Sequence, residues 1–350
     1  MPSTTSNTIK CWASFGKNED LKPFEYTPRP LGDHDVDIKI VCCGICGSDL
    51  HTIDSDWGAT KYPVVVGHEI VGNVIAKGNG VTHLDVGDVV GVGAMVYACN
   101  EPDCNACNRG FDPHCPKRVG TYNSKYSDGA TSYGGYSERV LVDSNYAFKI
   151  PQNIDLAEAA PLMCAGTTVF NPMLTFGFKE GDRVGVVGIG GLGHLAIQYA
   201  NKLGCIVTAF SQSENKKDQS FRLGAQKFIN TNNQHDLEAA KGSLDYLIVT
   251  SSSTSNDYEA FGTWVDFTGK IILLALPPKN LVLSPFFFVK NEVFIGGSLI
   301  GGIQRVKESL EFASKHNIRP LIEKMPMDKV NEGVNRVRDG KARYRVVLEN

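Results

Sequence analysis

The sequence contains no uninterrupted apolar run near the roughly 18 residues that a membrane-spanning helix needs, so we expect no membrane association. Its first twenty residues lack the apolar segment of a secretory signal, and we expect a cytoplasmic protein. There is no excess of basic charge, because the chain has 35 Lys and Arg and 38 Asp and Glu residues, which gives a net charge of −3. We therefore expect no nucleic-acid partner. The 350 residues, 42% of them hydrophobic, predict a globular chain of about two domains.

Cysteine, in contrast, is abundant and unevenly distributed. Seven of the ten cysteines form two groups along the chain: Cys42, Cys43 and Cys46, then Cys99, Cys104, Cys107 and Cys115. Without a secretory signal, grouped cysteines indicate metal ligands or reactive thiols before disulfides.

Two kinds of pattern divide the chain near Pro151. Before it, short β-type runs broken by glycine, such as Val36–Cys43, predict an irregular, mostly β region. After it, strand and helix patterns alternate, beginning with the strand 183–188 and the helix 192–203. This alternation predicts an α/β domain with a doubly wound parallel sheet. We expect a final helix and strand within 305–348 to rejoin the mostly β region.

A glycine-rich turn follows the first strand of the predicted parallel sheet and opens a helix. It fits the pattern G-x-G-x-x-G, and its candidate cofactor-binding residues are Gly188, Gly190, Gly191, Leu192 and Gly193. Glycines allow the backbone to approach a pyrophosphate, and the helix N-terminus offers free N–H groups. We interpret the turn as a dinucleotide site, and an ordinary strand-to-helix turn is the alternative.

The loop after the second strand should select the cofactor. NAD enzymes place an acidic residue at this strand end, where this chain has none. Hydroxyl and ammonium groups that could bind a 2′-phosphate are present instead, on Ser211, Ser213, Lys216 and Lys217. The loop therefore favours NADP over NAD. Glu214 is an unfavourable neighbour for a phosphate, and a solvated polar loop is the alternative interpretation.

The second cysteine group has the spacing C-x4-C-x2-C-x7-C, over Cys99, Cys104, Cys107 and Cys115. Four thiolates close together in sequence suit a closed, tetrahedral structural zinc site. The residues between them are mostly polar and cannot form a core, so metal binding would supply the folding free energy of this segment. Reduced thiols without a metal are the alternative.

Several motifs occur in an order that resembles one family. These are Cys46-Gly-Ser48-Asp49-Leu-His51, Gly67-His68-Glu69, the four-cysteine segment and the late glycine-rich turn. The chain resembles the zinc-dependent medium-chain alcohol dehydrogenases over nearly its whole length. Three further features are similar to the cinnamyl alcohol dehydrogenase branch, and in particular to its NADP-dependent, broad-specificity yeast-type members: Gly134-Gly135-Tyr136, the 211–217 loop and the ending Lys341–Arg345.

The resemblance implies two zinc ions per subunit. The catalytic zinc would have three ligands and one acidic neighbour that exchanges with its water: Cys46, His68, Cys164 and Glu69. Asp49 would orient the His68 ring, and Ser48 with His51 would form a proton relay. Trp57 either lines the substrate pocket or packs as an ordinary core residue.

The resemblance also assigns the structural zinc to the four grouped cysteines, but with one departure. The family usually spaces its first two cysteines as C-x2-C, whereas four residues separate Cys99 from Cys104. Counting back from Cys104 at the usual spacing reaches Glu101. Either Cys99 is kept after a two-residue insertion, or Glu101 is a ligand or the site is weakened.

The implied fold is a Rossmann domain, residues 161–299, inserted into a mostly β, GroES-like catalytic domain formed by residues 1–160 and 300–350. The implied reaction is hydride transfer between NADP(H) and an aldehyde or primary alcohol. A homodimer is implied as well, with Leu281–Ser298, including Phe286–Phe288, as an edge strand that pairs across a two-fold axis. A buried core within the monomer is the alternative for these apolar residues. The alternatives are an NAD-dependent polyol dehydrogenase, a zinc-free reductase and a non-catalytic NADPH-binding protein on the same fold.

Overall fold

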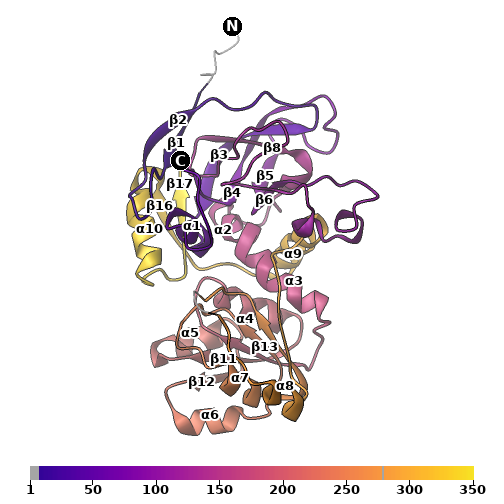
Figure 1. The fold of residues 1–350 in the computed structure, drawn as a ribbon, viewed down its shortest axis with the longest axis vertical. Helices are drawn as coiled ribbons and strands as arrows, with labels where there is room; N and C mark the ends of the chain where they lie inside the picture. The colour runs from indigo at the N-terminus through magenta and orange to yellow at the C-terminus, as the bar shows by residue number, and fades with distance from the viewer. Residues whose placement is uncertain (1–7, 278–279) are drawn as a thin grey trace. The chain divides into compact units, whose positions relative to one another are not determined.

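The computed structural model describes residues 8–277 and 280–350, and these residues form two compact units (Figure 1). Unit 1 consists of Met1–Cys164, Gly301–Ser314 and Arg319–Asn350. Unit 2 consists of Ala165–Ile300 and Lys315–Ile318. Within the described part of the chain, no helix has the length and apolar content that crossing a membrane requires.

Unit 1 is built on a seven-stranded sheet in which β16, β17, β3, β4, β5 and β9 lie in this order and β8 also pairs with β3. The strands are β3 (Asp35–Gly44), β4 (Glu69–Lys77), β5 (Val89–Val92), β8 (Arg139–Asp143), β9 (Phe148–Lys149), β16 (Ile322–Pro326) and β17 (Arg345–Glu349). Because β17 pairs with β3, the last strand of the chain completes a sheet made mostly by the first 150 residues. The mostly β region and its C-terminal completion were both predicted.

Two small antiparallel pairs accompany this sheet. They are β1 (Ile9–Ala13) with β2 (Lys22–Tyr26), and β6 (Met95–Tyr97) with β7 (Val119–Gly120). The helices that belong wholly or mainly to unit 1 are α1 (Gly47–Ile53), α2 (Leu156–Pro161), α9 (Ile303–His316) and α10 (Val330–Arg338). Short 3₁₀ turns span Cys107–Arg109, Asp112–His114, Ser144–Tyr146 and Met327–Lys329. The core is formed by apolar side chains of β3, β4 and β5, such as Ile38, Ile70 and Val90.

Unit 2 is a six-stranded sheet in which every pairing is parallel, in the order β12-β11-β10-β13-β14-β15. Its strands are β10 (Arg183–Val187), β11 (Ile206–Ser211), β12 (Lys227–Asn230), β13 (Leu244–Val249), β14 (Val265–Leu273) and β15 (Phe294–Gly297). Its helices are α3 (Thr167–Thr175), α4 (Gly193–Lys202), α5 (Lys217–Arg222), α6 (Gln234–Ala240), α7 (Tyr258–Trp264) and α8 (Pro285–Asn291), and a 3₁₀ turn spans Glu214–Lys216. The predicted doubly wound sheet is confirmed.

One local prediction was wrong. Phe286–Phe288 does not belong to an edge strand but lies in α8. The helix begins there because Ser284 caps it, accepting a hydrogen bond from the Phe286 N–H group, and Pro285 occupies its first position. The strand at this edge of the sheet is β15, which lies within the predicted range Leu281–Ser298 and pairs with β14.

Candidate functional site

A buried cluster in unit 1 brings together three residues that lie far apart in the sequence. The His68 Nε2 atom lies 3.1 Å from the Cys164 Sγ atom, and the Cys46 and Cys164 Sγ atoms are 4.0 Å apart. A carboxylate oxygen of Glu69 belongs to the same group, whose ligand atoms all lie within 4.8 Å of one another. The cluster therefore contains the residues that the sequence predicted for the catalytic zinc.

The sheet of unit 1 explains how these residues meet. Strand β3 ends at Gly44, directly opposite Glu69 at the start of β4. Cys46 follows β3 and precedes α1, while His68 directly precedes β4, so the pairing of the two strands brings them together. Cys164 comes from a π-helical turn, Leu162–Gly166, that joins α2 to α3.

Asp49, which the sequence analysis pairs with the His68 ring, contacts several parts of this cluster. It is fully buried, and its carboxylate accepts the N–H groups of Cys46 (2.9 Å) and Gly67 (3.1 Å). It lies 3.1 Å from the His68 Nδ1 atom and also accepts the Tyr136 hydroxyl (3.0 Å). In the neutral tautomer whose proton is on Nδ1 and directed at this carboxylate, the His68 Nε2 atom is the nitrogen that can bind a metal.

Charges and hydrogen bonds within the cluster shift the pKa values of its members in opposite directions: the pKa of Cys46 is lowered, while those of His68 and Cys164 are raised. Burial opposes a charge on His68, but the Asp49 carboxylate raises its pKa well above the usual range. The Cys164 thiol, opposed by burial and assisted by His68, lowers the pKa of Cys46 well below the usual range. Cys46 therefore has the thiolate character of a metal ligand.

Glu69 is fully buried and forms an ion pair with Arg345, which lies at the start of β17. Burial raises the pKa of Glu69 to about 7, although Arg345 acts against this shift. Its Oε2 atom is buried without a hydrogen-bond partner among the described residues. The buried carboxylate oxygen has no hydrogen-bond partner and lies beside two thiols and an imidazole. This combination fits a zinc site, because a bound zinc ion would interact with all of these donor atoms.

Sequence reasoning missed two members of this network. Arg345 was noted only as part of the C-terminal motif, and Tyr122 was not considered at all. The Tyr122 hydroxyl lies 2.9 Å from the His68 Nδ1 atom, although 54 residues separate the two in the chain. Neither contact follows from local spacing, because each depends on how distant segments pack.

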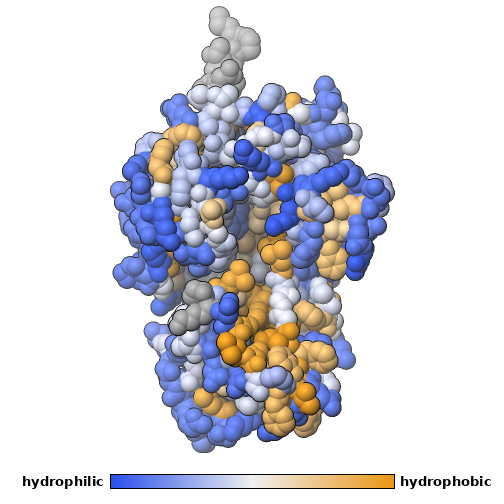
Figure 2. Space-filling model, viewed as in Figure 1, coloured by the Kyte–Doolittle hydropathy of each residue, from blue (hydrophilic) through white to orange (hydrophobic). Residues whose placement is uncertain are grey.

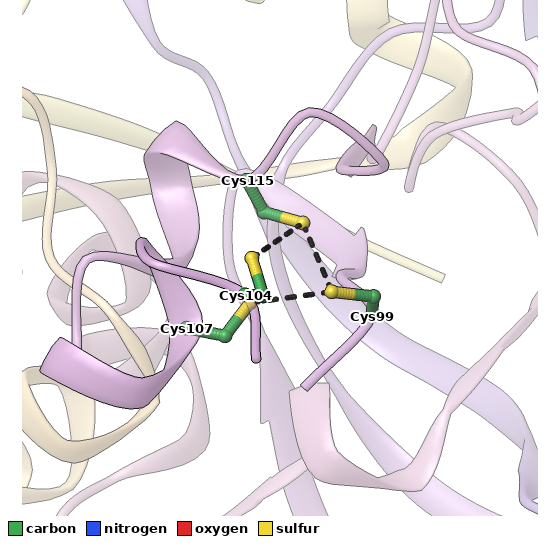
Figure 3. A group of neighbouring side chains, drawn as sticks. All are labelled: Cys99, Cys104, Cys107 and Cys115. Atoms are coloured by element: carbon green, nitrogen blue, oxygen red, sulfur yellow. Dashed lines mark hydrogen bonds between the residues drawn. The ribbon is translucent and has the colours of Figure 1, made fainter. Parts of the chain in front are cut away.

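The second cysteine group forms a separate cluster of four thiols (Figure 3). The Sγ atoms of Cys99 and Cys107 are 3.7 Å apart, those of Cys115 and Cys99 3.5 Å, and those of Cys104 and Cys115 4.0 Å. A tetrahedral zinc with Zn–S bonds of about 2.3 Å requires sulfur–sulfur separations of roughly 3.8 Å. All ten cysteines are free thiols, and the four of this cluster fit a structural zinc.

The geometry distinguishes the two readings of the spacing. Cys99 belongs to the four-thiol cluster, whereas Glu101 does not. The Glu101 carboxylate instead forms an exposed ion pair with the Lys117 ammonium group, with Nζ–Oε distances of 2.8 and 2.9 Å. The arrangement supports a two-residue insertion with Cys99 kept as the fourth ligand.

The expected relay residues both lie on α1. The Ser48 hydroxyl is 3.7 Å from the Cys46 Sγ atom, at the edge of the buried cluster. His51 is partly exposed, its Nδ1 atom is 3.1 Å from the Asp56 carboxylate, and its ring stacks on Trp57 at 4.4 Å. Trp57 is 50% exposed, so it is not a core residue and its described contact is with His51.

In unit 2, the glycine-rich turn has the geometry of a phosphate cradle. Gly188 has a φ of +88°, and a Cβ on Gly193 would come within 1.8 Å of the Gly188 carbonyl oxygen, so neither tolerates a side chain. A Cβ on Gly190 would meet no atom within 4 Å. Gly190 lies in the turn that leads into α4, and the protein's own packing does not require a glycine there. This fits a site where a pyrophosphate approaches the backbone.

The loop after β11 lies against this turn. The Lys216 ammonium donates a hydrogen bond to the Ile189 carbonyl (2.9 Å), which connects the two segments. The Ser213 N–H group donates to the Ser211 hydroxyl (3.2 Å). Glu214 is turned outward, where it accepts from the Asn230 amide (3.0 Å) and lies 3.7 Å from the exposed Lys217 ammonium. The loop thus holds hydroxyl and ammonium groups beside the turn.

Comparison with known proteins agrees with this geometry. Residues 32–152 match the alcohol dehydrogenase GroES-like domain, and residues 191–315 match the zinc-binding dehydrogenase family. A probable mannitol dehydrogenase of Medicago sativa is 43% identical over 340 residues, which are 97% of this chain and 94% of that protein.

Two solved structures are also similar. A cinnamyl alcohol dehydrogenase of Sorghum bicolor has a TM-score of 0.94 and 36% identity, covering 98% of this chain and 97% of that one. The cinnamyl alcohol dehydrogenase of Helicobacter pylori, solved with NADP(H), has a TM-score of 0.91 and 35% identity, covering 98% of both chains.

The fold and the two groups of candidate metal ligands define a zinc-dependent alcohol dehydrogenase, and the chain belongs to the zinc-containing medium-chain family of these oxidoreductases. Within that family it is a member of the cinnamyl alcohol dehydrogenase-like branch. The resemblance inferred from the motifs is confirmed, and so is the predicted combination of a GroES-like region with a Rossmann sheet.

Proposed function

We propose that the chain transfers a hydride between NADP(H) and an aldehyde or primary alcohol. The observation that carries this proposal is the buried group of Cys46, His68 and Cys164 with the unpartnered Glu69 oxygen. Zinc held by these three ligands would keep a position for water or substrate and would act as a Lewis acid on the carbonyl oxygen.

The protein's own residues would then manage the proton. Reduction of an aldehyde leaves an alkoxide oxygen, which takes up one proton as the alcohol forms. The Ser48 hydroxyl can both donate and accept a proton, and it lies at the edge of the metal cluster on α1. His51, on the same helix and partly exposed, is placed to exchange a proton with solvent.

The cofactor assignment rests on the turn and loop of unit 2. We assign the pyrophosphate to the turn Gly188–Gly193 and the 2′-phosphate to the loop residues Ser211, Ser213, Lys216 and Lys217. Ammonium and hydroxyl groups suit a phosphate, while the nearest carboxylate, Glu214, already has partners outside the turn. The NADP(H) in the similar Helicobacter pylori enzyme supports this choice.

We assign a different role to each of the two units. We propose that unit 1 is the catalytic domain, corresponding to the expected residues 1–160 and 300–350, and that unit 2, corresponding to 161–299, binds the dinucleotide. The names of the relatives include a mannitol dehydrogenase and cinnamyl alcohol dehydrogenases, so we propose substrates among aromatic and aliphatic aldehydes and their alcohols.

We further propose a homodimer formed through the edge of the unit 2 sheet. Hydrophobic side chains gather on one face of this unit (Figure 2). Val282, Phe286, Val289 and Phe294, in and beside α8 and β15, are between 61% and 89% exposed. An unpaired edge strand flanked by such side chains is a surface that a second copy would cover.

The test is oxidation of NADPH, in parallel with NADH, with a panel of aldehydes before and after removal of zinc by a chelator. NADPH-specific turnover that is lost with zinc supports the proposal. Turnover of polyols with NAD would support a polyol dehydrogenase instead. Absence of turnover, in a folded protein that binds zinc and NADPH, would overturn it.

A further inference from the structure

We propose that Tyr122 is a positioning residue for His68, and that it connects the Cys46–His68–Cys164 cluster to the four-cysteine segment. The inference rests on the proposed function, because it takes the first cluster as a zinc site. It adds a residue to which neither the motifs nor the comparisons assign a role.

The Tyr122 hydroxyl is placed within hydrogen-bonding distance of the His68 ring. Its oxygen lies 2.9 Å from the His68 Nδ1 atom. A phenol has one donor and two acceptor positions. The oxygen can therefore accept a hydrogen bond from the His68 Nδ1–H group.

This hydroxyl differs from that of Tyr136, which touches Asp49 but not the imidazole. Asp49 already accepts from Tyr136 and from the N–H groups of Cys46 and Gly67. The Nδ1–H group of His68 is therefore shared between a heavily used carboxylate at 3.1 Å and the Tyr122 oxygen at 2.9 Å. Tyr122 supplies a second acceptor that holds the ring with Nε2 facing the thiols.

The backbone on both sides of Tyr122 is fixed. On one side, the Thr121 N–H group donates to the Ala94 carbonyl (3.2 Å). On the other, the Asn123 side chain accepts from the Lys61 N–H group (3.0 Å). These two hydrogen bonds hold the backbone from which the Tyr122 side chain extends towards His68.

The same segment leads directly to the four-cysteine cluster. Strand β6 ends two residues before Cys99, and β7 begins four residues after Cys115. These strands pair with each other, so they close the base of the cysteine segment, and Tyr122 follows two residues after β7. A metal that fixes the four cysteines would therefore also fix the ladder from which Tyr122 reaches His68.

The test is the rate at which zinc leaves the holoenzyme. Wild type and Tyr122→Phe are exposed to a coloured chelator, and native mass spectrometry counts the zinc ions that remain. Removing the hydroxyl keeps the ring, and loss of such outer partners typically weakens metal binding about 10- to 100-fold. We expect one of two zinc ions to leave Tyr122→Phe at least about ten times faster.

Tyr133→Phe is the matched control, because Tyr133 is also partly buried, packs on Tyr26 and has no described hydroxyl contact with the cluster. A cobalt-substituted sample adds a spectrum that reports the ligand geometry, and this should change in Tyr122→Phe only. Equal zinc release and equal cobalt spectra in the wild type and Tyr122→Phe would overturn the inference. A wild type that binds no zinc at the first cluster would instead overturn the proposed function.

The connection to the four-cysteine segment has its own test, a double-mutant cycle. Cys99→Ser should accelerate zinc loss from the first cluster in the wild-type background. If Tyr122 carries the connection, the same change should add little in the Tyr122→Phe background. Independent, multiplicative effects of the two substitutions, or no effect of Cys99→Ser on that zinc, would refute the connection.

Discussion

The Nδ1 atom of His51 lies 3.1 Å from the Oδ2 atom of Asp56, while Trp57 stacks on the face of the same ring at 4.4 Å. The imidazole is therefore held both in its plane and across it. With Nδ1 directed at a carboxylate, Nε2 is the nitrogen left to exchange protons. This orientation suits His51 to the outer end of a relay whose inner end is Ser48.

The first prediction concerns that inner end. Ser48→Ala removes the hydroxyl at the edge of the metal cluster without touching a metal ligand. We expect turnover to fall by about 10²- to 10⁴-fold, the usual contribution of a positioned proton donor. Steady-state kinetics measures the loss, while zinc content and NADPH affinity stay unchanged. Ser48→Thr keeps a hydroxyl and should retain most activity, and full turnover by Ser48→Ala would remove the relay.

The second prediction concerns the choice of cofactor. Lys216→Ala removes an ammonium group beside the glycine-rich turn, and a charge-assisted hydrogen bond contributes about 1.5–3 kcal/mol. The KM for NADPH should rise roughly ten-fold or more, while that for NADH should change little. Lys227→Ala, on the exposed side of β12, is the control. A matched rise for both cofactors would contradict a role in 2′-phosphate binding.

The third prediction separates the two candidates for the fourth ligand of the structural zinc. Cys99 lies in the thiol cluster and Glu101 in an ion pair with Lys117. Cys99→Ser should lower the zinc content by about one ion per chain and reduce thermal stability. Glu101→Gln should keep both ions. Mass spectrometry measures the zinc content of both variants. Loss of a zinc ion from Glu101→Gln would show that Glu101 is a ligand of the structural zinc.

The fourth prediction concerns Asp112, which joins the cysteine segment to the start of α9. Its carboxylate is 3% exposed and accepts the Ile303 N–H group at 3.1 Å and the Tyr146 hydroxyl at 3.3 Å. Burial raises its pKa, which means that the folded state binds the proton more tightly than the unfolded state does. This stabilisation is fully present below the ordinary pKa of 3.8 and is lost as the pH rises through the folded pKa.

Asp112→Asn does not titrate, so its stability relative to wild type should increase as the pH rises from about 4. Urea unfolding of both proteins over a pH series measures this difference. Asp103→Asn, at an exposed position of the same segment, should show no such trend. A difference that is constant with pH would contradict the assignment.

The fifth prediction concerns the subunit contact. Phe294→Glu places a charge on the exposed face of the edge strand β15. We expect light scattering to show monomers where the wild type shows dimers. Phe267→Glu, at a 75% exposed position elsewhere in unit 2, controls for the general effect of adding charge. A dimer that survives Phe294→Glu would place the contact on another surface.

The sequence predicted those features that depend on local spacing. The glycine-rich turn, the cysteine group and the strand–helix alternation each follow from residues close together in the chain. Phe286–Phe288 shows the limit of this reasoning, because an aromatic run is compatible with a strand as well as with a helix. Only the capping residue Ser284 and the proline after it indicate that a helix begins here.

Contacts over long separations could not be derived in this way. Cys164 was assigned to the catalytic zinc only through the family resemblance, since nothing in its local sequence indicates His68. Arg345 and Tyr122 are ordinary residues in sequence, and only the pairing of β17 with β3 and of β6 with β7 brings them to the cluster.

Because of the π-helical turn Leu162–Gly166, the direction of the Cys164 side chain depends on the number of residues between α2 and α3. Such a turn holds one residue more than the α-helical ladder accommodates, and successive residues of an α-helix point about 100° apart. A chain shorter by one residue between α2 and α3 would be able to close a regular helix, and it would turn Cys164 away from His68. An insertion or deletion at this point would therefore exchange the residue that faces the Cys46 thiol and the His68 imidazole.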